Sequence, residues 1–599
     1  MPLYQISVPG PWWHDLTYES DTPLQAGIRV TVPVGRGIRV GICTGRTEEK
    51  ETSAVIKKIS RPLDHLPVLG QTYLHAAEII SYAFLCSKTE VLKSLLPAFF
   101  WKNANLPAFQ EIDKTGESTT EFIYMYSDEA RRHLYTERLL ECHESALCIF
   151  PEREQAKSFY ESLSGLIART RLFFWPGSGG KNALKFWNQI LSQDNAVVIG
   201  GPGAAAVPFQ NLRLLIIDDE SNPAWRTKKY PFFSLRSFAA ARSRCCGASL
   251  ILGGRLPSSR VYKNFSPAEP AVPQTIRESV RILDLESAAK VSFRGIQCPL
   301  PLSDVVVSET LSRVNRREIV FWLLDRRGVS AELRCADCGQ PVVCKRCGTV
   351  LVYENGSMRC PVCGQITPLP VKCPSCGGQL LQGFLPGLEK LFGFAQNLVG
   401  SSPVELWHLD NPKTVTEGKK RISELQKKGG LLLGSRRALS LLDTLSPSLI
   451  CWIDADAEAR QPHYDARFNA YSMLLESCSR GQGTQQVIMQ TRRSSQPCLT
   501  GLQAGWGYFW KKELAERAVL GFPPFTSIAE ITLPNAWSDR ASLLRDLNEN
   551  DFMPMLPDPA GHKIIVMAPR IALLRRVLKK YFSISASGRG FPQIQVWTD

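Results

Sequence analysis

The chain has 599 residues, of which 44% are hydrophobic, 21% charged and 9% aromatic, and its net charge is +15. This length is more than one hydrophobic core usually serves, so it excludes a single small module and suggests roughly four domains. The composition excludes a disordered or collagen-like chain. The positive charge favours a polyanionic partner but does not by itself establish nucleic-acid binding.

The N-terminal segment lacks the basic stretch and following apolar stretch of a secretory signal. Apolar runs also stay well short of the roughly 20 residues that cross a membrane. The sequence therefore predicts a cytoplasmic protein with no membrane partner. In that reducing compartment, regularly spaced cysteines indicate metal ligation before disulfides.

Residues 1 to about 100 begin with a predicted β-hairpin. Two alternating apolar runs, 28–34 and 38–43, flank Gly35-Arg36-Gly37, and a helical pattern follows over 73–86. Arginines of the hairpin are candidates for phosphate contacts, which position a protein on DNA without discriminating base sequence. These arginines are Arg29, Arg36, Arg39 and Arg46.

The middle of the chain has the rhythm of an α/β protein, in which short apolar runs alternate with helical patterns. Such runs lie at 146–150, 196–200, 212–217, 249–252, 319–324, 431–434, 449–454 and 487–491. A Pro- and Ser-rich stretch over 258–300 is expected to be a linker or irregular connection. A Cys-rich segment interrupts the rhythm from about residue 335, so we expect two α/β lobes with a small insert.

The last hundred residues predict a separate α+β domain, with strands at 528–533, 563–568 and 593–597. Between them lies a basic helix, 571–580. Its Arg575, Arg576, Lys579 and Lys580 suit the phosphates of a single strand, and a solvated helix face is the alternative.

Four C-x-x-C pairs form the strongest chemical signal in the sequence. They are Cys335/Cys338, Cys344/Cys347, Cys360/Cys363 and Cys373/Cys376. Two cysteines at this spacing reach one tetrahedral ion, so eight thiolates predict two four-cysteine zinc sites. A closed shell of four thiolates leaves no position for water or substrate, and we therefore expect structural zinc.

Several blocks of the chain resemble the bacterial replication restart protein PriA family. They include GIRVTVPVGRGIRVGICTG near the N-terminus, FPE at 150–152, LRLLIIDDES at 212–221, LGGRLPS at 252–258, PGLEK at 386–390, IDADAE at 453–458, PHYDA at 462–466 and LGFPPF at 520–525. The resemblance implies an α/β multidomain fold with two RecA-like helicase lobes and an insert that holds two four-cysteine zinc sites. It also implies an N-terminal β-rich DNA-binding domain and a C-terminal α+β domain.

The resemblance further implies a division of the chain into domains. The expected units are 1–100, the DNA-binding domain that is like the 3′-end-binding domain; 101–140, a remnant of the winged-helix and P-loop region; 141–300, lobe 1; 301–334, the start of lobe 2; 335–380, the zinc insert; 381–500, the rest of lobe 2; and 501–599, the C-terminal domain.

Some residue roles follow from the family alone. Cys335, Cys338, Cys373 and Cys376 would hold one zinc, and the other four cysteines the second. The family's F-D-Y triplet, which grips a 3′-terminal nucleotide, aligns with Leu16, Thr17 and Tyr18. Thr17 stands where the family has the contacting Asp, so this chain departs from the family pattern there.

The ATPase motifs of the family are degraded in this sequence. A P-loop needs glycines, Lys and a hydroxyl residue, and the corresponding segment from Tyr126 to Ala146 has no glycine. The near match WPGSGGKN, 175–182, has Trp175 and Asn182 at two required positions and lies on the wrong side of FPE. We treat it as a loop that leads into a helix.

The remaining nucleotide-site positions are Asp218, Asp219, Glu220 and Arg480. The family's D-E-E-H motif aligns with Asp218-Asp219-Glu220-Ser221 in this sequence, and its S-A-T motif aligns with Gly254-Arg255-Leu256. The family's G-R-A-G-R motif aligns with Ser479–Gly483, where one of its two arginines remains. We expect Asp218 and Asp219 to be a strand-end carboxylate pair and Arg480 to be a surface helix residue. The sequence thus predicts no catalytic residue, and it gives little support for ATP and Mg²⁺ as cofactors.

These features together predict an ATPase-dead relative of the DEAH-like helicases. Such a protein would bind branched or stalled forks, or single-stranded DNA, and help reload the replicative helicase. Its expected partners are primosome proteins, the replicative helicase or its loader, and single-stranded-DNA-binding protein. Two alternatives stay open: an active 3′-to-5′ helicase with an atypical nucleotide site, and a zinc-ribbon interaction protein outside replication.

Overall fold

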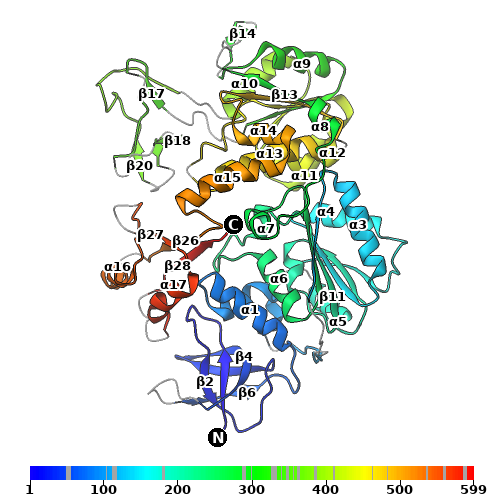
Figure 1. Ribbon diagram of the computed structural model, residues 1–599, viewed down its shortest axis with the longest axis vertical. Helices are drawn as coiled ribbons and strands as arrows, with labels where there is room; N and C mark the ends of the chain where they lie inside the picture. Colours follow the sequence, from blue (N-terminus) through cyan, green and yellow to red (C-terminus); the bar gives the residue numbers. More distant parts are fainter. Residues whose placement is uncertain are drawn as a thin grey trace.

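The computed structural model places lobe 2 above lobe 1, with the N-terminal domain below and the C-terminal domain beside them (Figure 1). The structure describes residues 1–48, 56–102, 104–110, 118–177, 182–285, 292–293, 295–298, 300–324, 333–338, 340–345, 350–354, 357–360, 365–383, 388–408, 412–461, 463–481, 483–534, 537–557, 562–583 and 590–599.

The N-terminal domain is a six-stranded sheet of order β5-β2-β1-β4-β3-β6, followed by helices. Its elements are β1 Leu3–Ser7, β2 Leu16–Glu19, β3 Arg29–Val34, β4 Gly37–Thr47, β5 Lys57–Lys58, β6 Arg61–Pro62, α1 Gln71–Ala83, α2 Lys88–Leu95 and η1 Ala98–Trp101. The predicted hairpin is confirmed as β3–β4. β5 and β6 follow each other closely but pair with opposite edges of the sheet, β2 and β3, so the sheet closes on itself.

Lobe 1 is a parallel sheet of order β7-β12-β11-β8-β10-β9. Its strands are β7 Thr120–Tyr124, β8 Ser145–Ile149, β9 Leu172–Phe174, β10 Val197–Gly200, β11 Leu212–Ile217 and β12 Ser249–Gly254. Its helices are α3 Asp128–Glu141, α4 Arg153–Ser162, α5 Ala183–Leu191, η2 Pro202–Ala206, η3 Pro223–Trp225, α6 Leu235–Cys245 and α7 Ser259–Phe265. The central strands are largely apolar because helices cover both faces. Within 101–140, β7 pairs with β12 and α3 follows it, so these two elements lie in this lobe.

Lobe 2 is a second parallel sheet, of order β13-β25-β24-β16-β23-β22. Its strands are β13 Val280–Asp284, β16 Ile319–Leu323, β22 Val404–Trp407, β23 Gly430–Gly434, β24 Leu449–Trp452 and β25 Gln486–Thr491. Its helices are α8 Gln274–Ser279, α9 Asp304–Asn315, α10 Leu388–Val399, α11 Val415–Lys428, η4 Arg436–Leu441, α12 Leu442–Leu445, α13 Ala466–Ser479 and α14 Pro497–Ala504.

The stretch 258–300 is more regular than the sequence predicts. It contains α7, α8 and β13, together with the hairpin of β14 Ser292–Phe293 and β15 Ile296–Gln297. β13 is the edge strand of lobe 2 and pairs along its whole length with β25. The expectation of an irregular linker is therefore wrong for much of this segment, whose Pro and Ser residues lie mostly between short elements.

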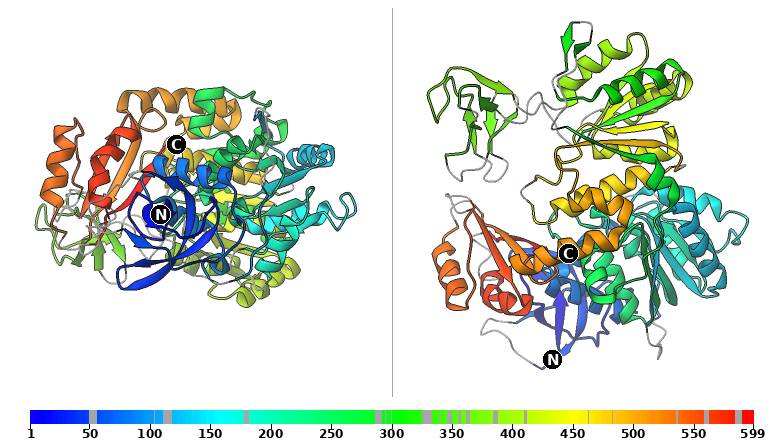
Figure 2. Two further views of the ribbon diagram at one scale, coloured as in Figure 1. Left: turned by 90° about the horizontal axis from the view of Figure 1, so that it is seen from below. Right: turned by 45° about the horizontal axis from the view of Figure 1, so that its top comes forward.

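The insert and the C-terminal domain extend from lobe 2. The insert contains β17 Leu333–Cys335 paired with β21 Leu381–Gly383, and a three-stranded sheet of β18 Val352–Glu354, β19 Ser357–Arg359 and β20 Ile366–Pro368. It stands apart from the lobe 2 sheet in both lateral views (Figures 1 and 2). The C-terminal domain comprises α15 Trp506–Leu520, β26 Ser527–Thr532, α16 Arg540–Glu549, β27 Lys563–Ala568, α17 Ile571–Leu578, η5 Lys579–Phe582 and β28 Gln593–Trp597.

One large apolar core runs through the N-terminal helices, lobe 1, part of lobe 2 and the C-terminal domain. The insert has a separate and much smaller core. Among the described helices, none has both the length and the apolar character needed to cross a bilayer.

Candidate functional sites

The loop between β7 and α3 occupies the place where the family resemblance puts a P-loop. Only Met125, Tyr126 and Ser127 join the strand to the helix. Ser127 caps α3 by accepting a hydrogen bond from the Ala130 N–H, and Asp128 and Glu129 follow in the first turn. A carboxylate at a helix N-terminus stabilises the helix, but it repels a phosphate at the same place.

The near match at 175–182 lies partly outside the described residues. Trp175, its first residue, follows β9 and is buried in the main core.

The carboxylate of Asp218 lies just after β11 and is held by Arg131 of α3. The Arg131 Nε donates to Asp218 Oδ1 at 2.6 Å and its Nη2 to Oδ2 at 3.3 Å, while the Tyr135 hydroxyl donates to Oδ1 at 3.0 Å. The side chains of Arg131 and Asp218 are each only 1% exposed. The arginine thus already pairs with the carboxylate that the family resemblance would offer to a metal ion.

Asp219 and Glu220 are also engaged by protein groups. Asp219 accepts from the Asn222 side-chain amide at 3.0 Å and lies 3.6 Å from Arg255 Nη1. Burial raises the pKa of Asp219, Arg255 offsets part of this rise, and Asp218 adds to it. Asp218 and Asp219 therefore do form the predicted pair at a strand end.

Glu220 is surrounded by hydrogen-bond donors. Arg236 pairs with its Oε2, and its Oε1 accepts from the Ser258 N–H at 2.6 Å and the Tyr124 hydroxyl at 3.0 Å. The Ser221 hydroxyl donates to the Leu256 carbonyl at 3.1 Å. Three donors of the protein thus bind the Glu220 carboxylate.

Arg255, in the segment that aligns with S-A-T, forms a further buried ion pair within lobe 1. Its Nη2 lies 2.5 Å from Asp128 Oδ2, and Arg131 Nη2 bonds the other oxygen of Asp128 at 2.8 Å. Burial works to raise the pKa of Asp128, but the guanidinium groups of Arg255 and Arg131 outweigh it and hold this pKa below its ordinary value.

Arg480 is not the surface residue that the sequence predicts. Its side chain is 1% exposed, because carboxylates from three different parts of the chain surround it. Its guanidinium bonds Glu152 of lobe 1 and, within lobe 2, Asp443 and Glu476. These charge-assisted hydrogen bonds offset the cost of taking the guanidinium out of water.

The arginines and carboxylates of these degraded motifs carry a net negative charge, and we call them the nucleotide-site cluster. The three arginines are Arg131, Arg255 and Arg480, and the six carboxylates are Asp128, Glu152, Asp218, Asp219, Asp443 and Glu476. A triphosphate with Mg²⁺ does not fit this arrangement, because its phosphates would face excess negative charge and its metal would have to displace Arg131.

Four of the predicted zinc ligands converge in the insert. The sulfur atoms of Cys335, Cys338, Cys373 and Cys376 all lie within 4.8 Å of one another. The Cys335–Cys376 and Cys338–Cys373 pairs are 3.6 and 3.8 Å apart. Sulfurs around a tetrahedral zinc with bonds of about 2.3 Å stand roughly 3.8 Å apart, so this cluster fits zinc.

The second predicted set is described only in part. Cys344 and Cys360 are buried in the small core of the insert, and Cys344 Sγ lies 3.2 Å from Gln365 Oε1. Cys347 and Cys363 lie outside the described residues. The second zinc site stays a prediction.

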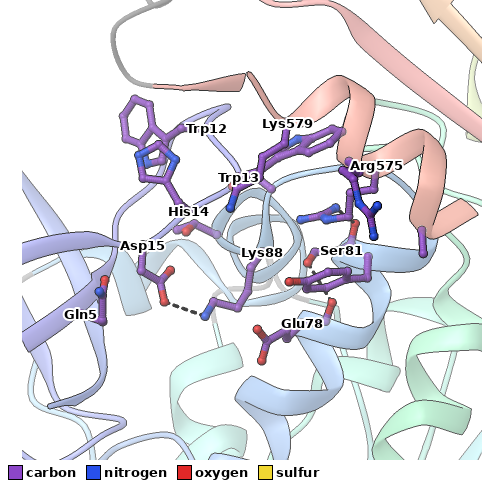
Figure 3. Close-up of a pocket in the computed structure, with 15 residues that line it drawn as sticks. Gln5, Trp12, Trp13, His14, Asp15, Glu78, Ser81, Lys88, Arg575 and Lys579 are labelled. Carbon is purple, nitrogen blue, oxygen red and sulfur yellow. Dashed lines mark hydrogen bonds and ion pairs between the residues drawn. The ribbon is translucent and has the colours of Figure 1, made fainter. Parts of the chain in front are cut away.

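A pocket of about 410 Å³ lies between the two ends of the chain, and we call it the interdomain pocket (Figure 3). It is lined by aromatic, basic and acidic side chains. These include Trp12, Trp13, His14, Asp15, Glu78, Tyr82, Lys88, Arg575, Arg576 and Lys579. Lys88 Nζ bonds Asp15 Oδ2 at 2.7 Å on one wall.

Arg575 forms part of the opposite wall and is mostly buried. Its guanidinium lies between the rings of Trp13 and Tyr82, 4.5 and 4.1 Å from their centroids, and donates to the Ser81 carbonyl at 2.7 Å. Trp13 also stacks on Phe582 at 4.2 Å. Arg575 therefore joins the N- and C-terminal domains, which leaves the exposed Arg576 and Lys579 as the cations of α17 and η5 that can meet a ligand in this pocket.

Four other residues that were predicted to contact DNA are exposed or half-buried. Lys580 pairs with Asp546 at 2.6 Å. Arg36 is exposed at the hairpin turn, and the exposed Arg39 stacks over Trp12 while donating to the Pro9 carbonyl. Thr17 is half-buried opposite Gln5 in the sheet.

Two residues are placed away from solvent. Arg29 is fully buried and bonds Asp64 together with the carbonyls of Phe100, Lys102 and Ala104, so the expectation of a phosphate contact there is wrong. Tyr18 is buried too, with its hydroxyl donating to the Pro33 carbonyl. Burial raises the pKa of Tyr18 to about 12, against a smaller effect of Arg39.

Sequence reasoning did not single out Trp12, Trp13, Tyr82 and Lys88 as site residues. A signal was present in Pro11-Trp12-Trp13-His14-Asp15, where two adjacent tryptophans stand in a loop between strands. Large aromatics in a loop point to an interface more often than to a strand core.

A family model and several curated relatives that match this chain carry the name PriA. A model of the PriA 3′DNA-binding domain (3′BD) matches residues 5–97. The replication restart protein PriA of Bacillus subtilis is 20% identical over 494 residues, which cover 79% of this chain and 60% of that protein. Its counterpart in Treponema pallidum is 22% identical over 547 residues, covering 84% of this chain and 81% of that protein. The chain thus spans less than two thirds of the Bacillus subtilis protein and a larger share of the Treponema pallidum one.

Among solved structures, Mss116p bound to single-stranded RNA and AMP-PNP superposes with a TM-score of 0.36 and 9% identity, over 73% of this chain and 75% of that one. RecG bound to a three-way DNA junction superposes with a TM-score of 0.33 and 10% identity, over 67% of this chain and 44% of that one. Structural similarity with TM-scores this low gives no information about function. The resemblance inferred from the sequence is nevertheless confirmed by the domain model and the curated relatives: this chain is related to the replication restart protein PriA.

Proposed function

We propose that this chain is a PriA-like primosomal protein without ATPase or helicase activity. It binds branched or stalled replication-fork DNA and promotes restart by helping to reload the replicative helicase. The observation that carries the proposal is the ion pair between Arg131 and Asp218, because the arginine already pairs with the carboxylate that the family resemblance would offer to a metal ion.

Three features beside this ion pair support the loss of hydrolysis. The loop before α3 has no glycine and is too short to wrap a phosphate. Glu220 is bound by Arg236, Tyr124 and Ser258. Of the two arginines in the family's G-R-A-G-R block, the terminal one is replaced by Gly483 here, and the retained Arg480 is bound by three carboxylates of the protein.

DNA binding is supported by the N-terminal domain match and by the chemistry of the interdomain pocket. Exposed cations there can contact phosphates, and the exposed ring of Tyr82 offers an aromatic surface on which a base can stack. The exposed Arg36 at the turn of the hairpin adds a further cation on the N-terminal domain. The partners proposed for reloading are primosome proteins, the replicative helicase or its loader, and single-stranded-DNA-binding protein.

We expect the zinc-replete protein to show no ATP turnover above background, with or without forked DNA. The physical reason is the net negative charge of the nucleotide-site cluster, in which the Asp218 carboxylate is already paired with Arg131. Steady-state release of phosphate is the measurement, with Asp218→Ala as the control for contaminating ATPase. Turnover that the fork stimulates and that Asp218→Ala abolishes would instead establish an active helicase with an atypical site.

We expect the double substitution Arg576→Ala, Lys579→Ala to weaken fork binding about 10-fold at about 0.15 M salt, because two phosphate contacts are lost. The slope of log affinity against log salt should fall by about 2. Fluorescence anisotropy with forked and linear duplex DNA over a salt series measures both quantities.

Lys580→Ala is the matched control, since Lys580 is already paired with Asp546. Its effect on fork affinity should be much smaller than that of the double substitution. Equal affinity of the unmodified protein for forked and linear DNA would count against the restart role and favour a zinc-ribbon interaction protein.

A further inference from the structure

Among the contacts of lobe 1 with the described residues that follow it in the chain, two differ in character. On one side, α15 of the C-terminal domain, which directly follows lobe 2, packs on lobe 1 through aromatic rings. The ring centroid of Tyr262 in α7 lies 5.8 Å from that of Trp506 and 6.1 Å from that of Trp510. The Trp510 indole also donates to the Pro257 carbonyl at 3.1 Å. The two tryptophans are buried in the main core, so this contact can act as the fixed side of a hinge.

On the other side, the lobes are joined by an ion pair. Glu152 immediately precedes α4 of lobe 1, and Arg480 immediately follows α13 of lobe 2. Arg480 Nη2 and Nη1 bond the two oxygens of Glu152 at 2.7 and 3.1 Å. This two-pronged geometry is among the strongest that an arginine and a carboxylate form.

The lobe 2 partners of Arg480 hold its side chain ready for Glu152. Arg480 Nε bonds Asp443 at 2.9 Å and Nη1 bonds Glu476 at 2.7 Å. Both contacts lie within lobe 2 and would persist if the lobes separated. Glu152 is 31% exposed, so water can replace its half of the contact when the lobes part.

We propose that the Glu152–Arg480 pair is a latch that keeps the lobes closed on the side away from the α7–α15 contact. The latch makes a carboxylate of lobe 1 the partner of the arginine that remains from the family's G-R-A-G-R block. This inference rests on the proposed absence of a hydrolytic cycle, and it adds that lobe closure is a property of the chain itself. A protein built in this way presents one fixed surface to DNA and partners.

The test is single-molecule energy transfer between dyes on lobe 1 and lobe 2, at the exposed positions Glu154 and Lys427. The dyes are carried by non-canonical amino acids, because the chain has 18 cysteines. Unmodified protein should give one narrow distance population. Glu152→Gln should add a longer-distance population of at least about one molecule in ten, since the closed state loses its ionic contact.

A matched variant separates the latch from general effects of charge. Glu161→Gln removes a surface pair with Lys157 on the helix that follows Glu152, and it should keep the single population of the unmodified protein.

The latch is overturned if Glu152→Gln has the same distance distribution as the unmodified protein, or if Glu161→Gln opens the lobes equally. Failure of the proposed function has another signature, which is ATP turnover or a loss of fork preference in the unmodified protein. The two failures are therefore distinguishable.

Discussion

Arg131→Ala is expected to destabilise lobe 1 by about 3–5 kcal/mol, the usual cost of removing one partner from a buried ion pair. The substitution leaves Asp218 buried, with the Tyr135 hydroxyl as its remaining donor among those described above, and it removes a bond to Asp128. For a domain of this size the loss corresponds to a fall of about 10 °C in melting temperature. Differential scanning calorimetry, in which the lobe 1 transition is followed, is the measurement.

Two variants control this experiment. Asp218→Asn added to Arg131→Ala should recover part of the loss, because it removes the buried charge that the single substitution leaves unpaired. Arg138→Ala, on the same helix, breaks the pair with Glu121 at the surface and should cost no more than about 1 kcal/mol. A melting temperature unchanged by Arg131→Ala would contradict the role of this arginine and would restore Asp218 as a candidate metal ligand.

The sheets of the lobes could be predicted because their signal is local. Runs such as 146–150 and 212–217 are short and apolar, and each became a buried strand, β8 and β11. The C-x-x-C spacing is local as well, since it fixes two thiols of a pair near each other. The spacing marks all eight cysteines, and the family resemblance, not the spacing, implied the group of Cys335, Cys338, Cys373 and Cys376 that the structure brings together.

The contacts that decide the nucleotide-site cluster could not be predicted in the same way. Arg131 and Asp218 come from different elements and meet only because β7, β12 and β11 are neighbours in the sheet. Arg480 lies at the end of a helix in a Gly-containing segment that has the pattern of a surface turn, and three carboxylates bury it. Comparison with a motif shows which of its residues are missing from the sequence. It does not show which other residues, such as Arg131, now contact the ones that remain.

The interdomain pocket was missed for a related reason. Trp13 and Arg575 lie at opposite ends of the chain, and their stacking depends on how α17 packs against α1. A basic helix pattern identifies a charged face but does not tell which arginine is covered. Arg575 is the covered one, while Arg576 beside it is exposed.

Zinc removal should unfold the insert and leave the lobes folded. Among the insert residues that the structure describes, the core has six buried apolar or cysteine side chains, Leu333, Val342, Cys344, Leu351, Met358 and Cys360, and two of these are predicted ligands. Structural zinc supplies about 10–16 kcal/mol in small modules, far more than such a core provides. Chelation followed by limited proteolysis should therefore give cleavage confined to residues 333–383, with the lobes resistant.

Single substitutions then separate the two predicted sites. Unmodified protein should contain about two zinc ions per chain, and Cys335→Ser and Cys360→Ser should each lower the content by about one. Elemental analysis measures this directly, with Cys246→Ser as the control, because Cys246 lies at the end of α6 in lobe 1. A Cys335→Ser protein that keeps the full zinc content would contradict the four-cysteine cluster. A loss with Cys335→Ser but not with Cys360→Ser would mean that the insert holds a single structural zinc, with Cys344 and Cys360 serving as core side chains.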